Sequence, residues 1–199
     1  MKFKLFFCLI SCSLLFFTSC SDIAENKNNT NTFASEQVIK QEQNYSIIKD
    51  ENNRYKYTIN NNDGYIVYQE STGFHYPNID LLNGNIIDIH IGYGTGIIYH
   101  KYYDIEQDVF SINYNNVITS NKKMIAFLKN SNDSSRYFDR LVISDIFDKS
   151  KFYKEYELDF SKVDIPIVSA SFDESNKNLD ILYLHGDNQE KTSYTINIY

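Results

Sequence analysis

Apolar and polar residues alternate in short runs through most of the chain, and turn-forming residues separate the runs. Residues 54–59 alternate before an Asn-rich turn that ends in Asp63-Gly64. Residues 79–82 and 85–91 flank Asn83-Gly84 in the same way. Alternation with a period of two predicts half-buried strands. Asp-Gly or Asn-Gly between such runs predicts hairpins, because these residues tolerate the positive φ that the turn requires.

No stretch of residues 45–199 shows sustained helical spacing, so the pattern predicts an all-β fold. We expect an antiparallel meander or β-sandwich, with residues 124–128 as a central strand because they are continuously apolar. Meanders that begin near Ile86, Met124 and Ile167 follow one another at intervals of about 40 residues, a period typical of propeller blades. A small or incomplete β-propeller is therefore the alternative, although the chain has no Trp and no WD dipeptide.

The first twenty residues have a different pattern. Lys2 and Lys4 form a basic head, residues 5–17 are apolar, and residues 18–20 are small. This order predicts a secretory signal peptide. The apolar run is shorter than the ~20 residues that a bilayer-spanning helix needs, so we do not expect a permanent transmembrane segment.

The end of this segment, Phe17-Thr18-Ser19-Cys20, resembles the lipobox of bacterial lipoproteins. The resemblance implies cleavage before Cys20 and acylation of its sulfur and new amino terminus with fatty acids such as palmitate. It also implies attachment to the bacterial cell membrane or outer membrane, with the domain extracytoplasmic. We therefore expect a signal peptide over 1–19, a lipidated Cys20 with a disordered polar tether over 20–44, and one β-rich domain over 45–199.

Composition narrows the function classes. The three cysteines are Cys8, Cys12 and Cys20, so the mature domain would contain no disulfide and no thiolate metal site. Removal of residues 1–19 leaves 17 basic and 26 acidic residues, a formal charge of −9. This balance argues against nucleic acid as a partner, because nucleic-acid-binding proteins carry basic patches. We expect no cofactor.

Three polar residues around a glycine-rich turn are the best candidates for chemistry. If the hairpin closes symmetrically about Gly94, Asp88 lies opposite His100, and His90 shares their face. An Asp–His pair beside a second His could bind a metal or act as a general base. The alternative, which we favour, is a set of polar residues on the solvated face of a strand pair.

Two weaker patterns remain. Asp104, Glu106 and Asp108 alternate in a turn and could hold a surface calcium ion, or form an ordinary solvated acidic turn. Exposed tyrosines such as Tyr99 and Tyr153 could stack on sugars, although tyrosine is also a common strand residue.

No nucleophile motif such as GxSxG occurs in the sequence. The leading hypothesis is a membrane-anchored, non-enzymatic envelope lipoprotein that binds a protein or a glycan. The main rival is a small metal- or carboxylate-dependent hydrolase that uses Asp88, His90 and His100. A third hypothesis is an inhibitor or immunity lipoprotein that presents its acidic surface to a basic toxin or wall enzyme.

Overall fold

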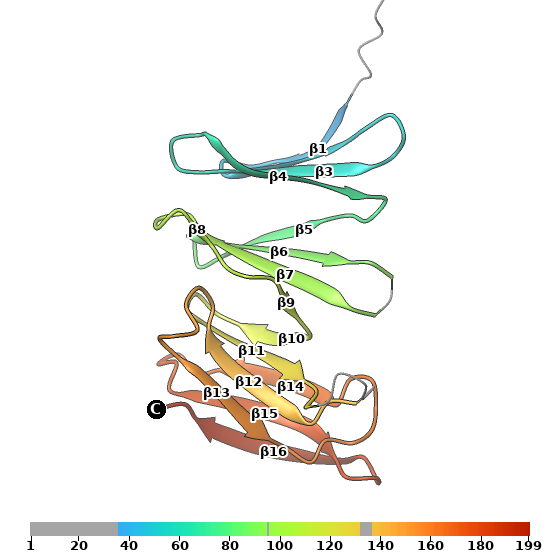
Figure 1. Ribbon diagram of the computed structural model, residues 1–199, viewed down its shortest axis with the longest axis vertical. Coiled ribbons are helices and arrows are strands. Elements are labelled where there is room, and N and C mark those ends of the chain that lie inside the picture. Colours follow the sequence, from blue (N-terminus) through green and yellow to red (C-terminus); the bar gives the residue numbers. More distant parts are fainter. Residues whose placement is uncertain (1–35, 95, 132–136) are drawn as a thin grey trace, which may run out of the picture. The chain divides into compact units, whose positions relative to one another are not determined.

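The computed structural model describes residues 36–94, 96–131 and 137–199. Within these ranges the chain forms sixteen strands, and the strands make four antiparallel sheets (Figure 1). The predicted all-β fold is confirmed. Across the same ranges, no helix has the length and apolar character needed to cross a bilayer. The predicted signal peptide and Cys20 lie outside the described residues.

The first sheet, sheet A, begins earlier in the sequence than expected. Gln37–Gln41 pairs with Tyr45–Lys49, so residues 37–44 of the expected tether belong to the folded domain. The side chains of this edge strand are largely exposed, and backbone hydrogen bonds hold it in place. A polar composition therefore does not exclude a strand here. The strands of sheet A are β1 (Gln37–Gln41), β2 (Tyr45–Lys49), β3 (Tyr55–Asn60) and β4 (Ile66–Gly73).

Sheet B contains the second predicted hairpin. Asn83 and Gly84 both have positive φ, 50° and 84°, as the Asn-Gly pair predicts. The strand expected over residues 109–114 is instead two short pieces, both of which pair with the same neighbour. The strands of sheet B are β5 (Asn78–Leu82), β6 (Ile86–Gly92), β7 (Ile98–Asp104), β8 (Val109–Phe110) and β9 (Tyr114–Asn115).

Sheets C and D complete the described chain. The apolar run at 124–128 is a central strand of sheet C, as predicted, and pairs on both sides. Sheet C consists of β10 (Val117–Ser120), β11 (Met124–Lys129), β12 (Arg140–Asp145) and β13 (Tyr153–Glu157). Sheet D consists of β14 (Ile167–Phe172), β15 (Asn178–His185) and β16 (Glu190–Asn197).

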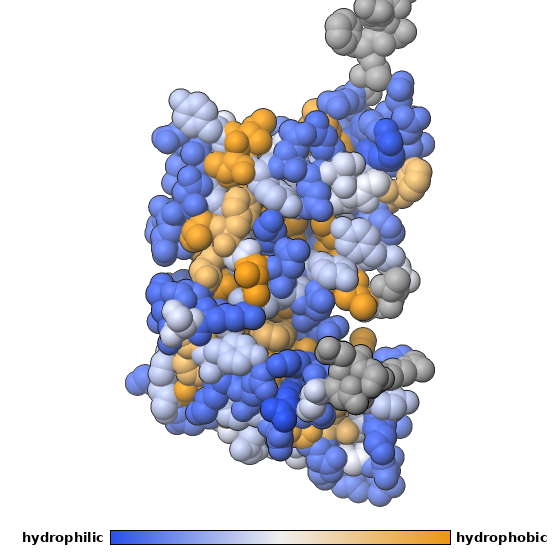
Figure 2. All heavy atoms as spheres, in the orientation of Figure 1, coloured by the Kyte–Doolittle hydropathy of each residue, from blue (hydrophilic) through white to orange (hydrophobic). Residues whose placement is uncertain are grey.

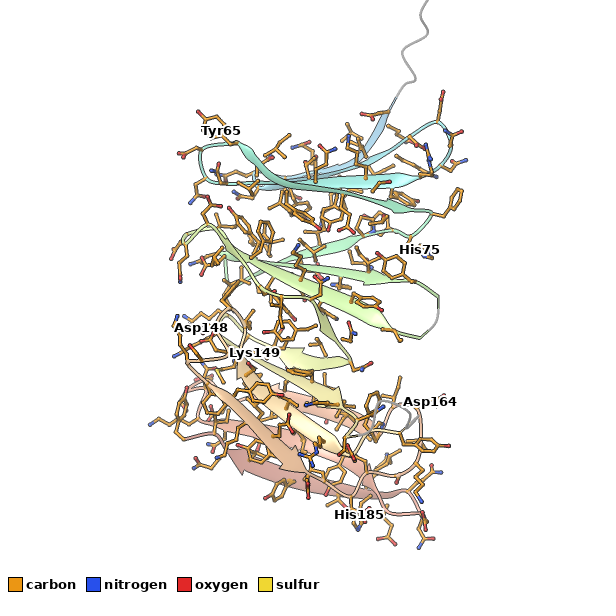
Figure 3. All side chains as sticks on the ribbon, in the orientation of Figure 1. Tyr65, His75, Asp148, Lys149, Asp164 and His185 are labelled. Atoms are coloured by element: carbon orange, nitrogen blue, oxygen red, sulfur yellow. The ribbon has the colours of Figure 1, made fainter. Side chains whose placement is uncertain are left out.

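Three buried clusters join each sheet to the next one in sequence. Residues such as Ile47 and Tyr57 of sheet A pack with Ile87 and Ile89 of sheet B. Sheet B then packs on sheet C, and sheet C packs on sheet D. Side chains fill the spaces between successive sheets (Figure 3). The repeat of about 40 residues is present from sheet A to sheet C, which begin at residues 37, 78 and 117, whereas sheet D begins at residue 167. The predicted starts at Ile86 and Met124 are therefore the second strands of sheets B and C, and the four sheets follow one another as an open stack (Figure 1).

The connections between the sheets differ in length. Asn116 alone, with a φ of 55°, joins β9 of sheet B to β10 of sheet C. Its carbonyl accepts a hydrogen bond of 3.0 Å from the Leu128 N–H. Residues 158–166 join sheet C to sheet D.

Apolar side chains reach the surface in scattered places between hydrophilic ones (Figure 2).

Candidate functional site

The structure brings Asp88, His90 and His100 together on strands β6 and β7. His90 is paired directly with His100, and Asp88 is paired with Tyr102. The predicted register, with Asp88 opposite His100, is therefore wrong by two residues. A shift of two keeps every side chain on its predicted face, because the side-chain period of a strand is two. We refer to Asp88, His90 and His100 as the histidine cluster.

The ligand atoms of the histidine cluster lie within 4.8 Å of one another. His100 Nδ1 is 3.0 Å from Asp88 Oδ1 and 3.3 Å from Oδ2, which is hydrogen-bond distance. His90 Nδ1 is 4.0 Å from Asp88 Oδ2 and 3.9 Å from the Asp80 carboxylate on β5. The two imidazole rings stack, with centroids 5.2 Å apart and planes 21° apart.

Most of this cluster is shielded from water. The exposed fractions of the side chains are 10% for Asp88, 16% for His100 and 25% for His90. His90 Nδ1 is itself buried and has no hydrogen-bond partner in the described part of the chain. The expectation that these residues lie on the solvated face of a strand pair therefore does not hold, because their side chains are largely buried. Their face of sheet B turns toward sheet C, since Ile86 and Tyr102 on the same face contribute to the buried cluster shared with sheet C.

The acidic turn of Asp104, Glu106 and Asp108 has a different organisation. Asp104 accepts hydrogen bonds from the backbone N–H groups of Glu106 and Gln107, at 2.9 and 3.0 Å. Asp108 accepts a hydrogen bond of 2.6 Å from the Tyr103 hydroxyl. Over the described ranges these carboxylates do not form a group with metal-ligand spacing. Two of the three therefore have structural roles, in shaping the turn and in holding a buried tyrosine.

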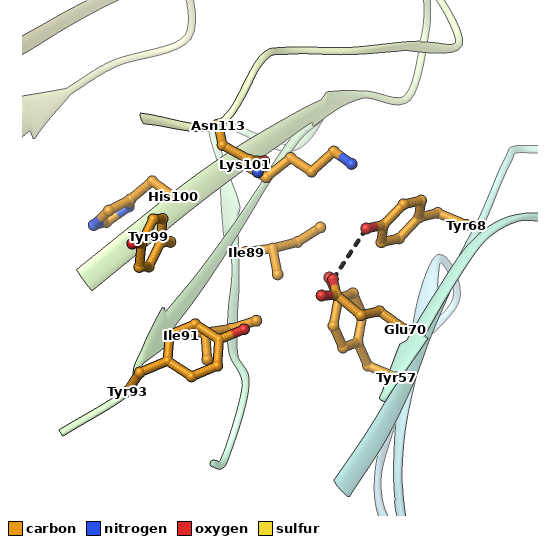
Figure 4. Close-up of a pocket in the computed structure, with 10 residues that line it drawn as sticks. All are labelled: Tyr57, Tyr68, Glu70, Ile89, Ile91, Tyr93, Tyr99, His100, Lys101 and Asn113. Carbon is orange, nitrogen blue, oxygen red and sulfur yellow. Dashed lines mark hydrogen bonds between the residues drawn. The ribbon is translucent and has the colours of Figure 1, made fainter. Parts of the chain in front are cut away.

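A cleft of about 420 Å³ lies on the other side of sheet B, between β3 and β4 of sheet A and β6 and β7 of sheet B (Figure 4). We call it the tyrosine cleft. Lys101 points toward the strands of sheet A, whereas the His100 ring points away from them. The residues that line the cleft are Tyr57, Tyr68, Glu70, Ile89, Ile91, Tyr93, Tyr99, His100, Lys101 and Asn113.

Glu70 is held at one wall of this cleft by two tyrosines. Its Oε2 accepts hydrogen bonds from the Tyr57 hydroxyl at 2.6 Å and from the Tyr68 hydroxyl at 3.0 Å. Burial, and then the hydrogen bond to Glu70, raise the pKa of both tyrosines. Both hydroxyls therefore keep their protons at neutral pH and donate to the Glu70 carboxylate.

The opposite wall supplies a cation and two partly exposed rings. Lys101 Nζ lies 3.9 Å from the centroid of the Tyr68 ring, a cation–π contact. Burial lowers the pKa of Lys101, and the nearby Glu70 opposes this shift. Tyr93 and Tyr99 pack edge to face with centroids 5.6 Å apart. Tyr93 and Tyr99 are both more than a third exposed, so their rings are available at the mouth of the cleft.

Tyr99 was expected from the sequence as a possible sugar-stacking residue, whereas no sequence pattern pointed to Glu70, Lys101, Tyr57 or Tyr68. These four residues come from two different sheets, and no local motif connects them. Tyr153, the other tyrosine singled out, lies on sheet C, where its hydroxyl donates a hydrogen bond of 2.6 Å to Glu155.

Comparisons with known proteins give a weak likeness of fold alone. No known protein-family model matches the chain, and no curated protein matches it in sequence. Among solved structures, it is similar to the uncharacterized protein lmo1340 from Listeria monocytogenes EGD-e, with 12% sequence identity and a TM-score of 0.41. The likeness covers 81% of this chain and 53% of the Listeria chain, so this chain spans about half the length of that protein.

Proposed function

We propose that the chain is a binding module that recognises a glycan through the tyrosine cleft. The observation that carries this proposal is the combination of exposed aromatic rings with a fixed carboxylate and a lysine in one open cleft. Tyr93 and Tyr99 offer ring faces and edges to the apolar face of a sugar. Glu70 and Lys101 provide an acceptor and a donor for sugar hydroxyls.

The size of the cleft fits this role. A volume of about 420 Å³ is within the ~300–1,000 Å³ of typical small-ligand sites. Because two tyrosine hydroxyls already fix Glu70, its orientation is set before a ligand arrives. Such preorganisation reduces the entropy lost on binding.

The proposal includes export and lipid anchoring. The basic head, the apolar run and the lipobox-like Phe17-Thr18-Ser19-Cys20 support an exported protein attached to the bacterial cell membrane or outer membrane through acyl chains on Cys20. Two or three acyl chains give stable attachment, whereas one alone is marginal. Metabolic labelling with a palmitate analogue tests this part: we expect label in the wild-type chain and none in Cys20→Ser.

Binding to a panel of defined oligosaccharides, including β-1,4-linked N-acetylhexosamine oligomers, tests the glycan proposal. For any oligosaccharide that binds, Tyr99→Ala and Tyr93→Ala should each raise the Kd roughly 2- to 10-fold, because each removes one aromatic contact. Tyr194→Ala is the control, since Tyr194 is about half exposed on β16, outside the cleft. Equal Kd values for all three variants would contradict the proposal. Capture of a protein by cross-linking in cells, with no oligosaccharide bound, would replace it.

A metal-assisted hydrolase is the second candidate, and the specific observation that favours it is the hydrogen bond between His100 and a largely buried Asp88. A carboxylate that orients a histidine is a common arrangement for a general base. Turnover of chromogenic ester and phosphodiester substrates tests this candidate: activity in the wild-type chain that is lost in His100→Ala would support it. Activity that persists in His100→Ala would dismiss this role for the cluster.

A further inference from the structure

We propose that the histidine cluster is a binding site for a divalent transition-metal ion of the zinc class. The ligands would be the carboxylate of Asp88 and one ring nitrogen each of His90 and His100. Two imidazoles and one carboxylate form a common three-residue set for such ions. The proposal does not depend on glycan binding: Asp88 and His90 do not line the tyrosine cleft, and His100, which does, turns its ring away from sheet A (Figure 4).

The spacing of the ligand atoms fits a tetrahedral ion. With metal–ligand bonds of about 2.0–2.1 Å, neighbouring ligand atoms of a tetrahedral zinc site lie about 3.3 Å apart. The distances from His100 Nδ1 to the two Asp88 oxygens, 3.0 and 3.3 Å, are close to this value. The distance of 4.0 Å from His90 Nδ1 to Asp88 Oδ2 requires only a small inward movement of one ring.

A buried nitrogen without a partner is the second, independent observation. His90 Nδ1 is inaccessible to water and makes no hydrogen bond within the described ranges. Leaving a buried polar atom unsatisfied is unfavourable, and proteins usually pair such atoms. The atom faces the carboxylates of Asp88 and Asp80, at 4.0 and 3.9 Å. A cation between the imidazoles and these acidic groups would satisfy the nitrogen and offset the negative charge.

The surrounding strands fix the orientation of the ligands. Direct pairing of His90 with His100 across β6 and β7 stacks their rings, and the Tyr102 ring also stacks with His100, with centroids 6.1 Å apart. Asp80 is paired with Asp88 across β5 and β6, and its carboxylate lies 3.9 Å from His90 Nδ1, where it would add negative charge beside the ion.

A small cavity adjoins the site. It has a volume of about 160 Å³ and includes His100 in its lining, together with apolar residues such as Ile98, Val117 and Leu128. Three protein ligands leave one tetrahedral position for water or another small ligand. We infer that this fourth position faces the cavity between sheets B and C.

Titration of the purified, untagged full chain with Co²⁺ tests the proposal directly. Tetrahedral cobalt absorbs visible light strongly, so we expect a d–d band that saturates at one equivalent and disappears when Zn²⁺ is added. This measurement uses the wild-type chain, so it does not depend on whether a variant folds. A wild-type chain that gives no saturable band, or only an octahedral aqua-ion spectrum, would overturn the proposal.

Substitutions then assign the ligands. His90→Ala, His100→Ala and Asp88→Ala should each raise the Kd for Zn²⁺ by more than the roughly 10- to 100-fold that loss of an outer-shell partner causes, and Asp80→Ala by no more than that. His185→Ala is the matched control, because His185 Nδ1 also lies near a carboxylate, 3.6 Å from Asp159, at the far end of the described chain (Figure 3). Circular dichroism establishes that each variant is folded. Equal affinity in the control and the three cluster variants would refute the assignment.

The metal-binding proposal and the glycan-binding proposal can fail independently of each other. Tyr99→Ala should bind Zn²⁺ as the wild type does, and it should lose oligosaccharide affinity. Asp88→Ala or His90→Ala that binds oligosaccharide normally but no metal would support both proposals at once, since neither residue lines the tyrosine cleft.

Discussion

The two faces of sheet B use the same strands for different purposes. On the face toward sheet A, Ile87 and Ile89 of β6 join a buried apolar cluster. On the face toward sheet C, the intervening Asp88 and His90 lie beside His100, and these three polar side chains are largely buried. Because successive side chains of a strand alternate, one hairpin supplies both faces. A polar site can therefore lie on one face of sheet B without replacing any residue of the apolar cluster on the other face.

The apolar face should be the more sensitive of the two to truncation. Ile89→Ala removes a side chain that is 1% exposed and should lower the free energy of unfolding by about 2–5 kcal/mol, from lost burial and the cavity left behind. Urea denaturation measures this loss. Ile66→Ala, at an exposed position on β4, is the matched control and should change stability by about 1 kcal/mol or less. Similar losses in both variants would contradict the contrast between the two positions.

Truncation of a side chain on the polar face should lower the free energy of unfolding by less, and this loss should come from a broken hydrogen bond. Asp88→Ala leaves His100 without its carboxylate acceptor and should lower the free energy of unfolding by about 1–3 kcal/mol, measured by urea denaturation with EDTA present. Asp80→Ala is the control. Its side chain is 64% exposed, so we expect a change within about 0.5 kcal/mol. If Asp80→Ala lowers the free energy of unfolding as much as Asp88→Ala does, the stabilising role belongs to the Asp80 carboxylate.

Alkaline pH should weaken the contacts between sheets B and C. Burial, with a smaller effect of Asp145, raises the pKa of Tyr114 from 10.0 to about 12. Between these values the unfolded chain has lost the proton and the folded chain retains it, so unfolding releases a proton and rising pH favours unfolding. The stabilising contribution is complete below pH 10 and declines above it by up to about 1.4 kcal/mol per pH unit.

Unfolding in urea at pH 8, 10 and 11 measures this slope. Tyr114→Phe should reduce the loss of stability above pH 10, and the other buried tyrosines should account for what remains. If the slope is the same in the wild type and in Tyr114→Phe, the raised pKa of Tyr114 does not cause the pH dependence of the free energy of unfolding.

The smallest effect on stability is expected at the mouth of the tyrosine cleft. Tyr93→Ala should lower the free energy of unfolding by about 1 kcal/mol, because the ring is more than a third exposed but makes edge contacts with His75 and Tyr99. The same substitution should reduce oligosaccharide affinity. Thermal denaturation and binding measured on one sample distinguish the two effects. A large loss of Tm would mean that Tyr93 is part of the core instead.

Local sequence patterns determined the hairpins but not the pairing register. The Asn83-Gly84 turn and the alternation in residues 86–91 were predicted correctly, since both depend on neighbouring residues. The register of β6 with β7 was wrong by two residues, because symmetry about Gly94 was assumed. In the structure Gly92 pairs with Ile98, and Gly94 and Gly96 both have positive φ within the intervening loop. The faces were nevertheless correct, and for this reason the histidine cluster was predicted.

The tyrosine cleft could not be predicted from local sequence patterns. Glu70 and Lys101 come from different sheets, and their proximity depends on how sheet A packs on sheet B. Strand β1 was missed for a related reason: its polar side chains indicate exposure, whereas its backbone pairing with β2 determines its conformation.

The single-residue connection at Asn116 has a consequence for how the molecule tolerates change in length. Loop extension is generally inexpensive in entropy, so an insertion beside the exposed Ile165 in the 158–166 connection should have little effect. At Asn116 the same insertion would alter the stagger of β10 relative to β9 and displace the hydrogen bond from the Leu128 N–H. Asn116 thus acts as a fixed spacer that sets the separation of two layers and, with it, the dimensions of the cavity beside His100.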